Sequence, residues 1–287
     1  MNDKNKTEKG TLYLVGTPIG NLSDMSERAI KILSEVDFIA AEDTRNSLRL
    51  LTHLGIKKPM VSYFEHNKLE RGGQIIARLK AGESGALITD AGMPAISDPG
   101  EDLVRLCAEN DVPVTTAPGP CAAITALTLS ALPTGRFSFE GFLSAVKSER
   151  RSALGKLSSE ERTMIFHEAP HKLKSTLADM KSSFGGDRRI AVCRELTKLN
   201  EQILRSTLDE AIEYYDTYEP RGEFVLVVEG AKSSVSVEEF WKELSPSEHV
   251  KHYISCGMSK NDAIKAAAKD RKVPKNDIYK EVLDIKA

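Results

Sequence analysis

Along the first 120 residues, short apolar runs alternate with longer segments in which apolar residues recur at helical spacing. The apolar runs predict strands at Thr11–Gly16, Asp37–Ala41, Met60–Phe64, Ala86–Asp90 and Pro113–Ala117. The periodic segments predict helices at Glu27–Val36, Thr44–Leu54, Asn67–Ala81 and Asp98–Glu109. Ser26 and Asp98 are expected as N-caps, and Gly55 as a C-cap. Alternation of this length predicts a mainly parallel sheet that is covered on both faces.

A second α/β pattern follows from about Pro118. Cys121 to Ala131 predicts a buried helix of small residues. Strands are predicted at Phe137–Gly141, Arg162–His167, Arg188–Leu196 and Glu223–Glu229, and helices at Glu149–Leu157, His171–Phe184 and Leu208–Tyr218. The uneven alternation favours a mixed sheet.

After Gly230 the pattern changes to short helices. Ser233–Val237 is typical of a linker, and helices are predicted at Glu238–Leu244, Ser247–Ser255, Ser259–Arg271 and Lys275–Ile285. Ser259 to Asp262 has the form of a capping box with Asp in the last position, and Pro274 suits a first helical turn. The last two helices resemble a helix-turn-helix, a form that many packing units share. The predicted organisation is therefore a flexible tail at 1–10, α/β domains at 11–119 and 120–232, and a helical module at 233–287.

The composition excludes several classes of protein. Of the 287 residues, 40% are hydrophobic and 29% are charged, which is typical of a globular protein with a substantial core. No run of 18 apolar residues is present, so no membrane span is expected. The four cysteines and six histidines lack the spacing of a zinc site or a disulfide framework, so no metal is expected. The first ten residues lack the apolar core of a signal peptide, and cysteines without a disulfide framework are typical of reduced thiols in a cytoplasmic protein.

Charge is unevenly distributed along the chain. The net charge is −2, yet from Ser245 to Ala287 nine Lys or Arg residues outnumber six Asp or Glu residues. A basic tail on an acidic body favours a polyanionic partner, although a solvated helical face gives the same pattern.

Three predicted strands of the first domain end in loops rich in glycine and proline. The loops are GTPIGN at Gly16–Asn21, the end of LITDAGMPAISDPG at Leu87–Gly100, and APGPCAA at Ala117–Ala123. Any one of them alone suits an ordinary connection. Because the carboxyl ends of parallel strands share one sheet edge, three of them together predict a ligand pocket there. No GxGxxG or GxxxxGK[ST] motif is present, which argues against dinucleotide and P-loop sites.

These loops belong to a longer series of motifs that resembles a known family. The series is GTPIGNLSD, AEDTRNS, YFEHN, LITDAGMPAISDPG, APGPCAAITAL, FEGF, FHEAPHK, CRELTK and GEFVLVVEG. It resembles the tetrapyrrole methylase superfamily, the class III methyltransferases. Within that superfamily it is most similar to the bacterial enzymes that methylate a cytidine ribose 2′-oxygen in the decoding region of 16S rRNA. The resemblance covers Thr11 to Lys232, with a similar helical tail, and Phe166 stands where Tyr is expected.

The resemblance implies two α/β domains with S-adenosylmethionine between them, a homodimer, and the small ribosomal subunit as partner. It implies that the loop from Asp90 to Ser97 holds the methionine part of the cofactor and that Pro18 lies at the mouth. The implied cofactor-binding residues are Pro18, Asp90, Ala91, Gly92, Ile96, Ser97, Cys121, Ala122, Phe166, Glu168, Ala169, Arg194 and Leu196.

Methyl transfer to a hydroxyl requires alignment of the two partners and control of the hydroxyl proton, but no metal. Lys198 and Glu195 in RELTK are the candidate catalytic residues. A neutral Lys198 would take the proton, whereas a charged Lys198 would stabilise the developing alkoxide. The alternative is that Lys198 only pairs with Glu195.

Candidate RNA-binding residues are Arg45, His66 and Lys260. Arg45 equally suits a salt bridge to Asp43 or Glu42, and Asn67 beside His66 suits a helix cap. His167 and His171 are expected to be hydrogen-bonded structural residues. Two other functions stay open: methylation of a tetrapyrrole or another small molecule, and a catalytically silent RNA-binding role in ribosome assembly.

Overall fold

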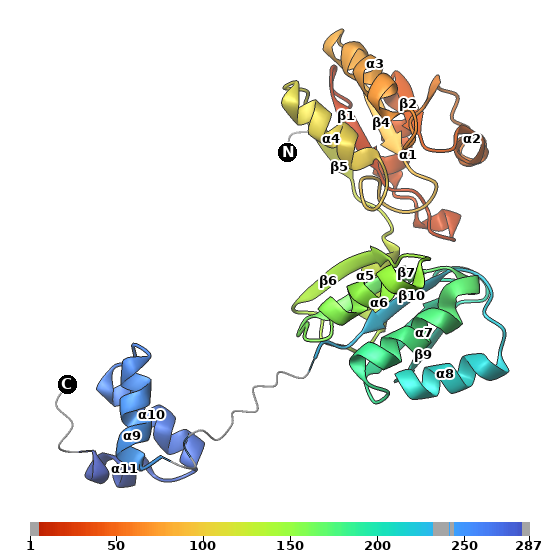
Figure 1. Ribbon diagram of the computed structural model, residues 1–287. Coiled ribbons are helices and arrows are strands. Elements are labelled where there is room, and N and C mark those ends of the chain that lie inside the picture. The colour runs from red at the N-terminus through yellow and green to blue at the C-terminus, as the bar shows by residue number, and fades with distance from the viewer. Residues whose placement is uncertain (1–5, 232–240, 242–243, 283–287) are drawn as a thin grey trace. The chain divides into compact units, whose positions relative to one another are not determined.

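The computed structural model describes residues 6–231, 241 and 244–282 (Figure 1). The chain divides into two compact units, Met1–Gly230 and Ala231–Ala287. The first unit contains two five-stranded sheets, and the regular elements among the described residues of the second unit are all helices.

The first sheet is entirely parallel, with strand order β3-β2-β4-β1-β5. Its strands are β1 (Leu12–Val15), β2 (Phe38–Ala41), β3 (Met60–Ser62), β4 (Gly85–Ile88) and β5 (Val114–Ala117). The three strands that precede the Gly/Pro loops, β1, β4 and β5, are neighbours in this order. Their loops therefore leave the sheet side by side.

Helices cover both faces of the first sheet, as the alternation of elements predicts (Figure 1). They are α1 (Glu27–Glu35), α2 (Thr44–His53), α3 (Lys68–Lys80) and α4 (Gly100–Glu109). Successive residues of β2 point to opposite faces: Ile39 packs in the cluster with α1 and α2, and Phe38 in the cluster with α3 and α4.

The second sheet is mixed, with strand order β6-β7-β10-β8-β9. Only β6 and β7 pair in parallel. Its strands are β6 (Phe137–Phe142), β7 (Thr163–Glu168), β8 (Arg189–Arg194), β9 (Gln202–Thr207) and β10 (Phe224–Val228). One face packs against α5 (Ala122–Leu129), and the other packs against α6 (Lys147–Lys156), α7 (Pro170–Phe184) and α8 (Leu208–Thr217).

Three predictions about elements of the first unit are wrong. The edge strand β9 is missing from the prediction, because most of its residues are half-buried and carry no apolar alternation. The strand predicted to reach Leu196 ends at Arg194, because Glu195 adopts a left-handed backbone with φ of 51°. Asp98 is not the N-cap of α4, since Pro99 occupies that position. Ser26 does cap α1, by accepting a hydrogen bond from the backbone N–H of Ala29.

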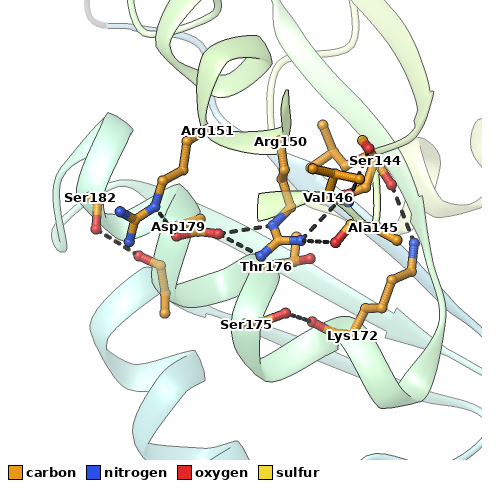
Figure 2. A network of polar contacts seen from close by, with 12 residues as sticks. Ser144, Ala145, Val146, Arg150, Arg151, Lys172, Ser175, Thr176, Asp179 and Ser182 are labelled. Carbon is orange, nitrogen blue, oxygen red and sulfur yellow. Dashed lines mark hydrogen bonds and ion pairs between the residues drawn. The ribbon is translucent and has the colours of Figure 1, made fainter. Parts of the chain in front are cut away.

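A buried ion pair joins α6 to α7 beneath the second sheet (Figure 2). Arg150 donates from Nε to Oδ2 of Asp179 over 2.9 Å, and its side chain is 6% exposed. Its remaining donors reach the carbonyl oxygens of Ser144 and Ala145, in the loop that follows β6. Arg151, which is 54% exposed, binds the other oxygen of Asp179. The network therefore fixes the loop between β6 and α6 to the long helix α7.

The second unit packs α9 (Pro246–Ser255), α10 (Lys260–Arg271) and α11 (Lys275–Glu281) around an apolar core. Ser259 caps α10 by accepting from the N–H of Asp262, and Pro274 is the N-cap of α11. The predicted linker at 233–237, most of the predicted helix at 238–244 and the last predicted residues at 283–285 lie outside the described residues. Within the described part of the chain, no helix has the length and hydropathy of a membrane span.

Candidate active site

The three Gly/Pro loops meet at the edge of the first sheet. A Cβ atom on Gly16 would lie 2.7 Å from Cα of Gly119, so only two glycines allow these backbones to touch. The N–H of Gly119 donates to the sulfur of Met93 over 3.1 Å. Thr17 and Gly92 exchange both backbone hydrogen bonds, at 2.9 and 3.1 Å. The predicted convergence of the loops is therefore confirmed.

The second of the three loops in chain order, which follows β4 and is called the middle loop here, has a strained backbone. Ala95 and Ser97 have φ of 69° and 63°, in the left-handed region that residues with a Cβ seldom adopt. Oδ1 of Asp98 accepts hydrogen bonds from the N–H groups of Ala95 and Gly100, at 3.0 and 2.7 Å. Backbone strain of this kind clusters at ligand sites, where the surroundings fix the geometry in advance.

A cavity of about 340 Å³ opens beside these loops. Its size suits a small-molecule ligand, since such sites run from about 300 to 1,000 Å³. Residues from both sheets and from the junction between them form its walls: Ile19, Ala91, Gly92, Met93, Ile96, Cys121, Ala122, Ala123, Phe142, His167, Glu168, Ala169, Pro170, Cys193, Leu196, Glu223, Phe224 and Val225. Most of these side chains are apolar, which leaves recognition to a small number of polar groups.

One buried carboxylate stands in the wall of the second sheet. Glu168, at the end of β7, is 3% exposed. It accepts from the N–H of Ala169 at 2.7 Å and from Oγ1 of Thr176 at 2.5 Å. Nζ of Lys172 lies 3.1 Å away, and it also donates to the carbonyl of Leu143. All these contacts satisfy the buried charge, so Glu168 serves to hold the wall together.

The ELTK turn after β8 forms a second strained segment beside the cavity. Glu195 and Thr197 have φ of 51° and 65°. The N–H of Thr197 donates to Oε2 of Glu201 over 2.7 Å, and the N–H of Lys198 donates to the carbonyl of Glu195. A Cβ on Gly20 would lie 2.4 Å from Cγ of Lys198, so the GTPIGN loop packs directly on the lysine stem.

The Lys198 ammonium sits between two carboxylates. Nζ lies 2.8 Å from Oε1 of Glu195 and 2.8 Å from Oε2 of Glu223. Partial burial lowers the pKa of Lys198, but the hydrogen bonds to the two glutamates outweigh it and raise the pKa above its ordinary value. The hydrogen bond from Lys198 also lowers the pKa of Glu195, despite the opposing effect of burial. The geometry therefore favours a charged lysine over a neutral one. The ion pair with Glu195, which the sequence analysis gave as the alternative to a catalytic role, is also present.

The structure places eight of the thirteen predicted cofactor-binding residues in the cavity wall: Ala91, Gly92, Ile96, Cys121, Ala122, Glu168, Ala169 and Leu196. Pro18 and Ser97 do not line the cavity and only neighbour residues that do. Asp90 turns to the amide of Asn46, 3.1 Å away. Nε of Arg194 donates to the carbonyl of Arg221 over 2.6 Å. Lys198 and Glu195 are outside the wall, but their shared partner Glu223 is part of it.

Phe166 does not line the cavity, although the family resemblance implies that it binds the cofactor. It is fully buried in the core cluster beneath α7, on the face of β7 that points away from the cavity. Its neighbour His167 lines the cavity instead, because successive strand residues face opposite sides. The expectation that His167 is hydrogen-bonded is also wrong, since its Nε2 is buried with no partner among the described residues.

None of the three candidate RNA-binding residues is among the residues that line the cavity. Arg45 is 88% exposed and pairs with Asp43, so the salt bridge is present and the guanidinium still faces solvent. His66 is exposed at the turn before α3. Asn67 is the N-cap residue there, but its side chain binds Ser62 and Phe64 and not the helix end. Lys260 begins α10 in the helical unit. Among the described residues, no cluster of His, Cys, Asp or Glu has the form of a metal site.

Comparison with known families gives a match over most of the chain. A profile of the family Tetrapyrrole (Corrin/Porphyrin) Methylases matches residues 11–212. The chain is also similar to proteins named Ribosomal RNA small subunit methyltransferase I. The one from Halalkalibacterium halodurans is 50% identical over 96% of this chain and 95% of the relative. The one from Bacillus subtilis is 48% identical over 97% and 96%.

Solved structures show the same fold at low sequence identity. A uroporphyrin-III-C-methyltransferase from Thermus thermophilus matches with a TM-score of 0.53 and 18% identity, covering 77% of this chain and 94% of that protein. A cobalt precorrin-4 methyltransferase matches with a TM-score of 0.55 and 15% identity, over 77% and 95%.

Proposed function

The chain belongs to the tetrapyrrole methylase family, and from that premise we propose that it is an S-adenosylmethionine-dependent methyltransferase that methylates the ribose 2′-oxygen of a cytidine in 16S rRNA of the small ribosomal subunit. One observation carries the proposal: the similarity to relatives named for small-subunit rRNA methylation extends over 96–97% of the chain. That extent must include most of residues 231–287, beyond the end of the family profile at residue 212. It favours rRNA over a tetrapyrrole as substrate.

The cavity suits the cofactor on structural grounds. Its walls are largely apolar, and they include Gly92, where an added Cβ would come within 3.3 Å of Cγ2 of Ile19. Ala91, Gly92 and Ile96 would hold the methionine part, while Cys121, Ala122 and Leu196 would enclose the remainder. When bound, the cofactor supplies a methyl group already activated on a sulfonium sulfur. The residues of the chain must then align the substrate hydroxyl with that methyl group and stabilise the negative charge that develops on the hydroxyl oxygen.

We propose that Lys198 stabilises that charge. Its ammonium is fixed by Glu195 and Glu223, and Glu223 reaches into the cavity wall. A cation held in advance at the position of a developing alkoxide stabilises the transition state without reorganisation. We assign Glu195 and Glu223 to positioning the ammonium, and Lys198 to the substrate oxygen.

We extend the proposal to the assembly and its location. The family resemblance supports a homodimer, which sedimentation velocity of the purified protein would detect as twice the mass of one chain. The proposed substrate and cofactor meet in the cytoplasm, so that is where the enzyme is expected to act.

Mapping of ribose methylation in 16S rRNA tests the function. We expect rRNA from cells lacking this protein to lose 2′-O-methylation at one cytidine of the decoding region. A plasmid carrying the intact gene should restore it, and one encoding Lys198→Ala should not. An unchanged methylation map in the deletion strain would contradict the proposal.

Gly92→Val is expected to abolish measurable binding of S-adenosylhomocysteine by the folded protein. Gly92 has φ of 85°, and a Cβ there would lie 3.3 Å from Cγ2 of Ile19 and 3.4 Å from the carbonyl of Pro120. A branched side chain must therefore shift the loop or enter the cavity. Isothermal titration calorimetry measures the affinity.

Gly82→Val is the matched control for Gly92→Val. Gly82 has φ of 93° and no atom within 4 Å of its added Cβ, so it carries the same backbone strain away from the cavity. Equal affinities of Gly92→Val and Gly82→Val would remove the middle loop from the binding site.

The helical unit is expected to strengthen RNA binding without affecting the cofactor. It carries the surplus of positive charge found from Ser245 onward. Each neutralised phosphate contributes a slope of roughly −0.7 to the log–log salt dependence on single-stranded RNA. A chain ending at Lys232 should therefore bind 16S rRNA more weakly and with a flatter salt slope, at unchanged affinity for S-adenosylhomocysteine. Filter binding across a salt series measures the affinity for rRNA and its salt slope. Equal slopes for the full and the shortened chain would exclude an RNA role for this unit.

A further inference from the structure

Phe142, the last residue of β6, is an exposed aromatic residue in the wall of the cavity. It is 61% exposed, whereas Phe224, the other phenylalanine of the wall, is 2% exposed. A residue that lines the cavity and is largely exposed lies where the cavity opens to solvent. Single exposed apolar side chains are common on protein surfaces, so exposure alone does not indicate a ligand. The orientation of this ring, however, is specified by the strand that carries it.

A β-bulge turns Phe142 toward the cavity. β6 pairs in parallel with β7, and Phe139 stands beside Ile165 while Phe142 stands beside His167. The two phenylalanines are three residues apart and their partners are two apart, so β6 carries one extra residue, with Gly141 at φ of 65°. Without that residue, strand alternation would turn Phe142 to the opposite face, which α6 and α7 cover. Both rings instead contact the ring of His167, at 5.2 and 5.3 Å between centroids.

The segment that follows Phe142 is anchored to α7 through the network in Figure 2. Nζ of Lys172 lies over the ring of Phe142, 5.8 Å from its centroid, and donates to the carbonyl of Leu143 over 3.3 Å. The next two carbonyl groups of the chain accept from the buried Arg150. Bulges recur beside active sites, where they redirect one side chain. The bulge and the anchored loop therefore fix the ring in advance, as a recognition group requires.

Phe142 lies on the same side of the second sheet as the group that holds Lys198. Val225 of β10 stands opposite His167, and Glu223, two residues earlier, binds Nζ of Lys198 at 2.8 Å. Phe142, Val225 and Glu223 all line the cavity. Only β7 separates β6 from β10, so the backbones of Phe142 and Val225 are about 10 Å apart, or two strand spacings. One nucleotide can therefore face both the ring and the lysine.

A nucleobase is the ligand group that suits a fixed and exposed aromatic ring. Bases of single-stranded RNA are recognised by stacking on aromatic side chains, and proteins that bind such RNA combine this stacking with positive charge along the backbone. The next helix of the chain, α6, exposes Lys147 and Lys156, against one exposed acidic residue, Glu149. The ring and the neighbouring cations together favour RNA over a free small molecule at this rim.

We propose that Phe142 is a substrate-recognition residue whose ring stacks on the base of the cytidine that is methylated. This inference rests on the proposed function, because it takes the substrate to be rRNA. Stacking holds the base at the rim while the ribose of the same nucleotide reaches Lys198. The ring acts on RNA alone, so its loss leaves the affinity for the cofactor unchanged.

Three variants of Phe142 and one control test the proposal. The substrate is the small ribosomal subunit from cells lacking this protein, and calorimetry with S-adenosylhomocysteine reports cofactor binding and an intact fold. Phe142→Ala removes the ring, Phe142→Leu keeps an apolar side chain without a π face, and Phe142→Trp keeps a π face. Phe137→Ala is the matched control, because Phe137 is 39% exposed on the same strand and does not line the cavity.

We expect Phe142→Ala to lower kcat/KM for the subunit on the order of 10–100-fold, mainly through KM, which is the typical effect of losing one stacked base. Phe142→Leu should lose as much, Phe142→Trp should keep most of the rate, and Phe137→Ala should match the wild type. All four should bind S-adenosylhomocysteine as the wild type does.

Three results would overturn the proposal. Full activity of Phe142→Ala would remove the ring from substrate recognition. Full activity of Phe142→Leu would show that an apolar contact suffices without stacking. Weaker binding of S-adenosylhomocysteine by Phe142→Ala would assign the ring to the cofactor. Failure of the wild type to methylate the subunit would instead refute the proposed function.

A substrate without the target base locates the contact. Subunits reconstituted with 16S rRNA that carries an abasic ribose at the target position remove the other half of the proposed stack. The wild type should be slowed by a factor similar to that of Phe142→Ala, and Phe142→Ala should be slowed little further, because the two changes remove one interaction. Independent, multiplying losses would show that Phe142 contacts a different base, and the assignment to the target cytidine would be wrong.

Discussion

Replacing Lys198 by alanine is expected to lower the rate of methyl transfer by about 10²–10³-fold, while cofactor affinity stays within a fewfold of the wild type. The estimate follows from the loss of one fixed group that stabilises charge in a transition state. Two glutamates hold the ammonium at 2.8 Å each, and they raise its pKa against the effect of burial. Single-turnover assays with saturating cofactor and rRNA measure the step directly.

Two further variants separate charge from packing. The stem of Lys198 lies against Gly20, so alanine also removes an apolar contact between the two halves of the unit. Lys198→Met keeps that stem and removes the charge, and it should be as slow as Lys198→Ala. Lys198→Arg keeps the charge and should retain part of the rate. Near-normal turnover by Lys198→Met would return this lysine to a purely structural role.

Asp179→Asn is expected to destabilise the first unit by about 3–5 kcal/mol, the typical cost of breaking a buried ion pair from one side. The replacement leaves the Arg150 guanidinium, which is 6% exposed, without its counter-charge. A loss of this size lowers the unfolding temperature by on the order of 10 °C in a domain of this length. Thermal unfolding followed by circular dichroism gives the shift.

The same carboxylate supplies its own control. Arg151 binds the other oxygen of Asp179 but is 54% exposed, so Arg151→Met should cost no more than about 1 kcal/mol. Arg150→Met combined with Asp179→Leu should be less destabilising than Asp179→Asn, because no unpaired charge remains. Comparable losses of stability in Arg151→Met and Asp179→Asn would show that burial does not determine how much each ion pair of Asp179 contributes.

Lowering the pH should reduce the stability that the ion pair of Asp179 contributes. Burial raises the pKa of this carboxyl, but the hydrogen bonds from Arg151 and Arg150 outweigh burial and hold the pKa below 3.8. The ion pair therefore contributes fully above pH 3.8, and the contribution is lost as the pH falls through the folded-state pKa. The difference in stability between wild type and Asp179→Asn should narrow over that interval.

The sequence predicts the first sheet and its ligand edge well because the signals there are local. Gly16, Gly92 and Gly119 mark turns that directly follow apolar strands, and parallel pairing of neighbouring strands then brings those turns together. No knowledge of the distant chain is needed beyond the fold class. The helices of the first domain are equally predictable, since each carries one continuous apolar face.

The second sheet is harder to predict because its pairing is long-range. β9 is an edge strand without an apolar face, and only its antiparallel contact with β8 identifies it. The choice between Phe166 and His167 depends on which face of β7 meets the cavity, which the local sequence leaves open. Glu223 joins the site because β10 lies between β7 and β8, an order that the chain sequence does not reveal.

Ile19 bears on the folding cooperativity of the two sheets. It belongs to the loop of the first sheet, yet it packs in the apolar cluster of α5 and the second sheet and is 9% exposed. Pulling the sheets apart would expose that cluster to water and break the contact of Gly20 with Lys198. Their unfolding is therefore expected to be coupled, so that the first sheet, the second sheet and the cavity between them are lost in one step.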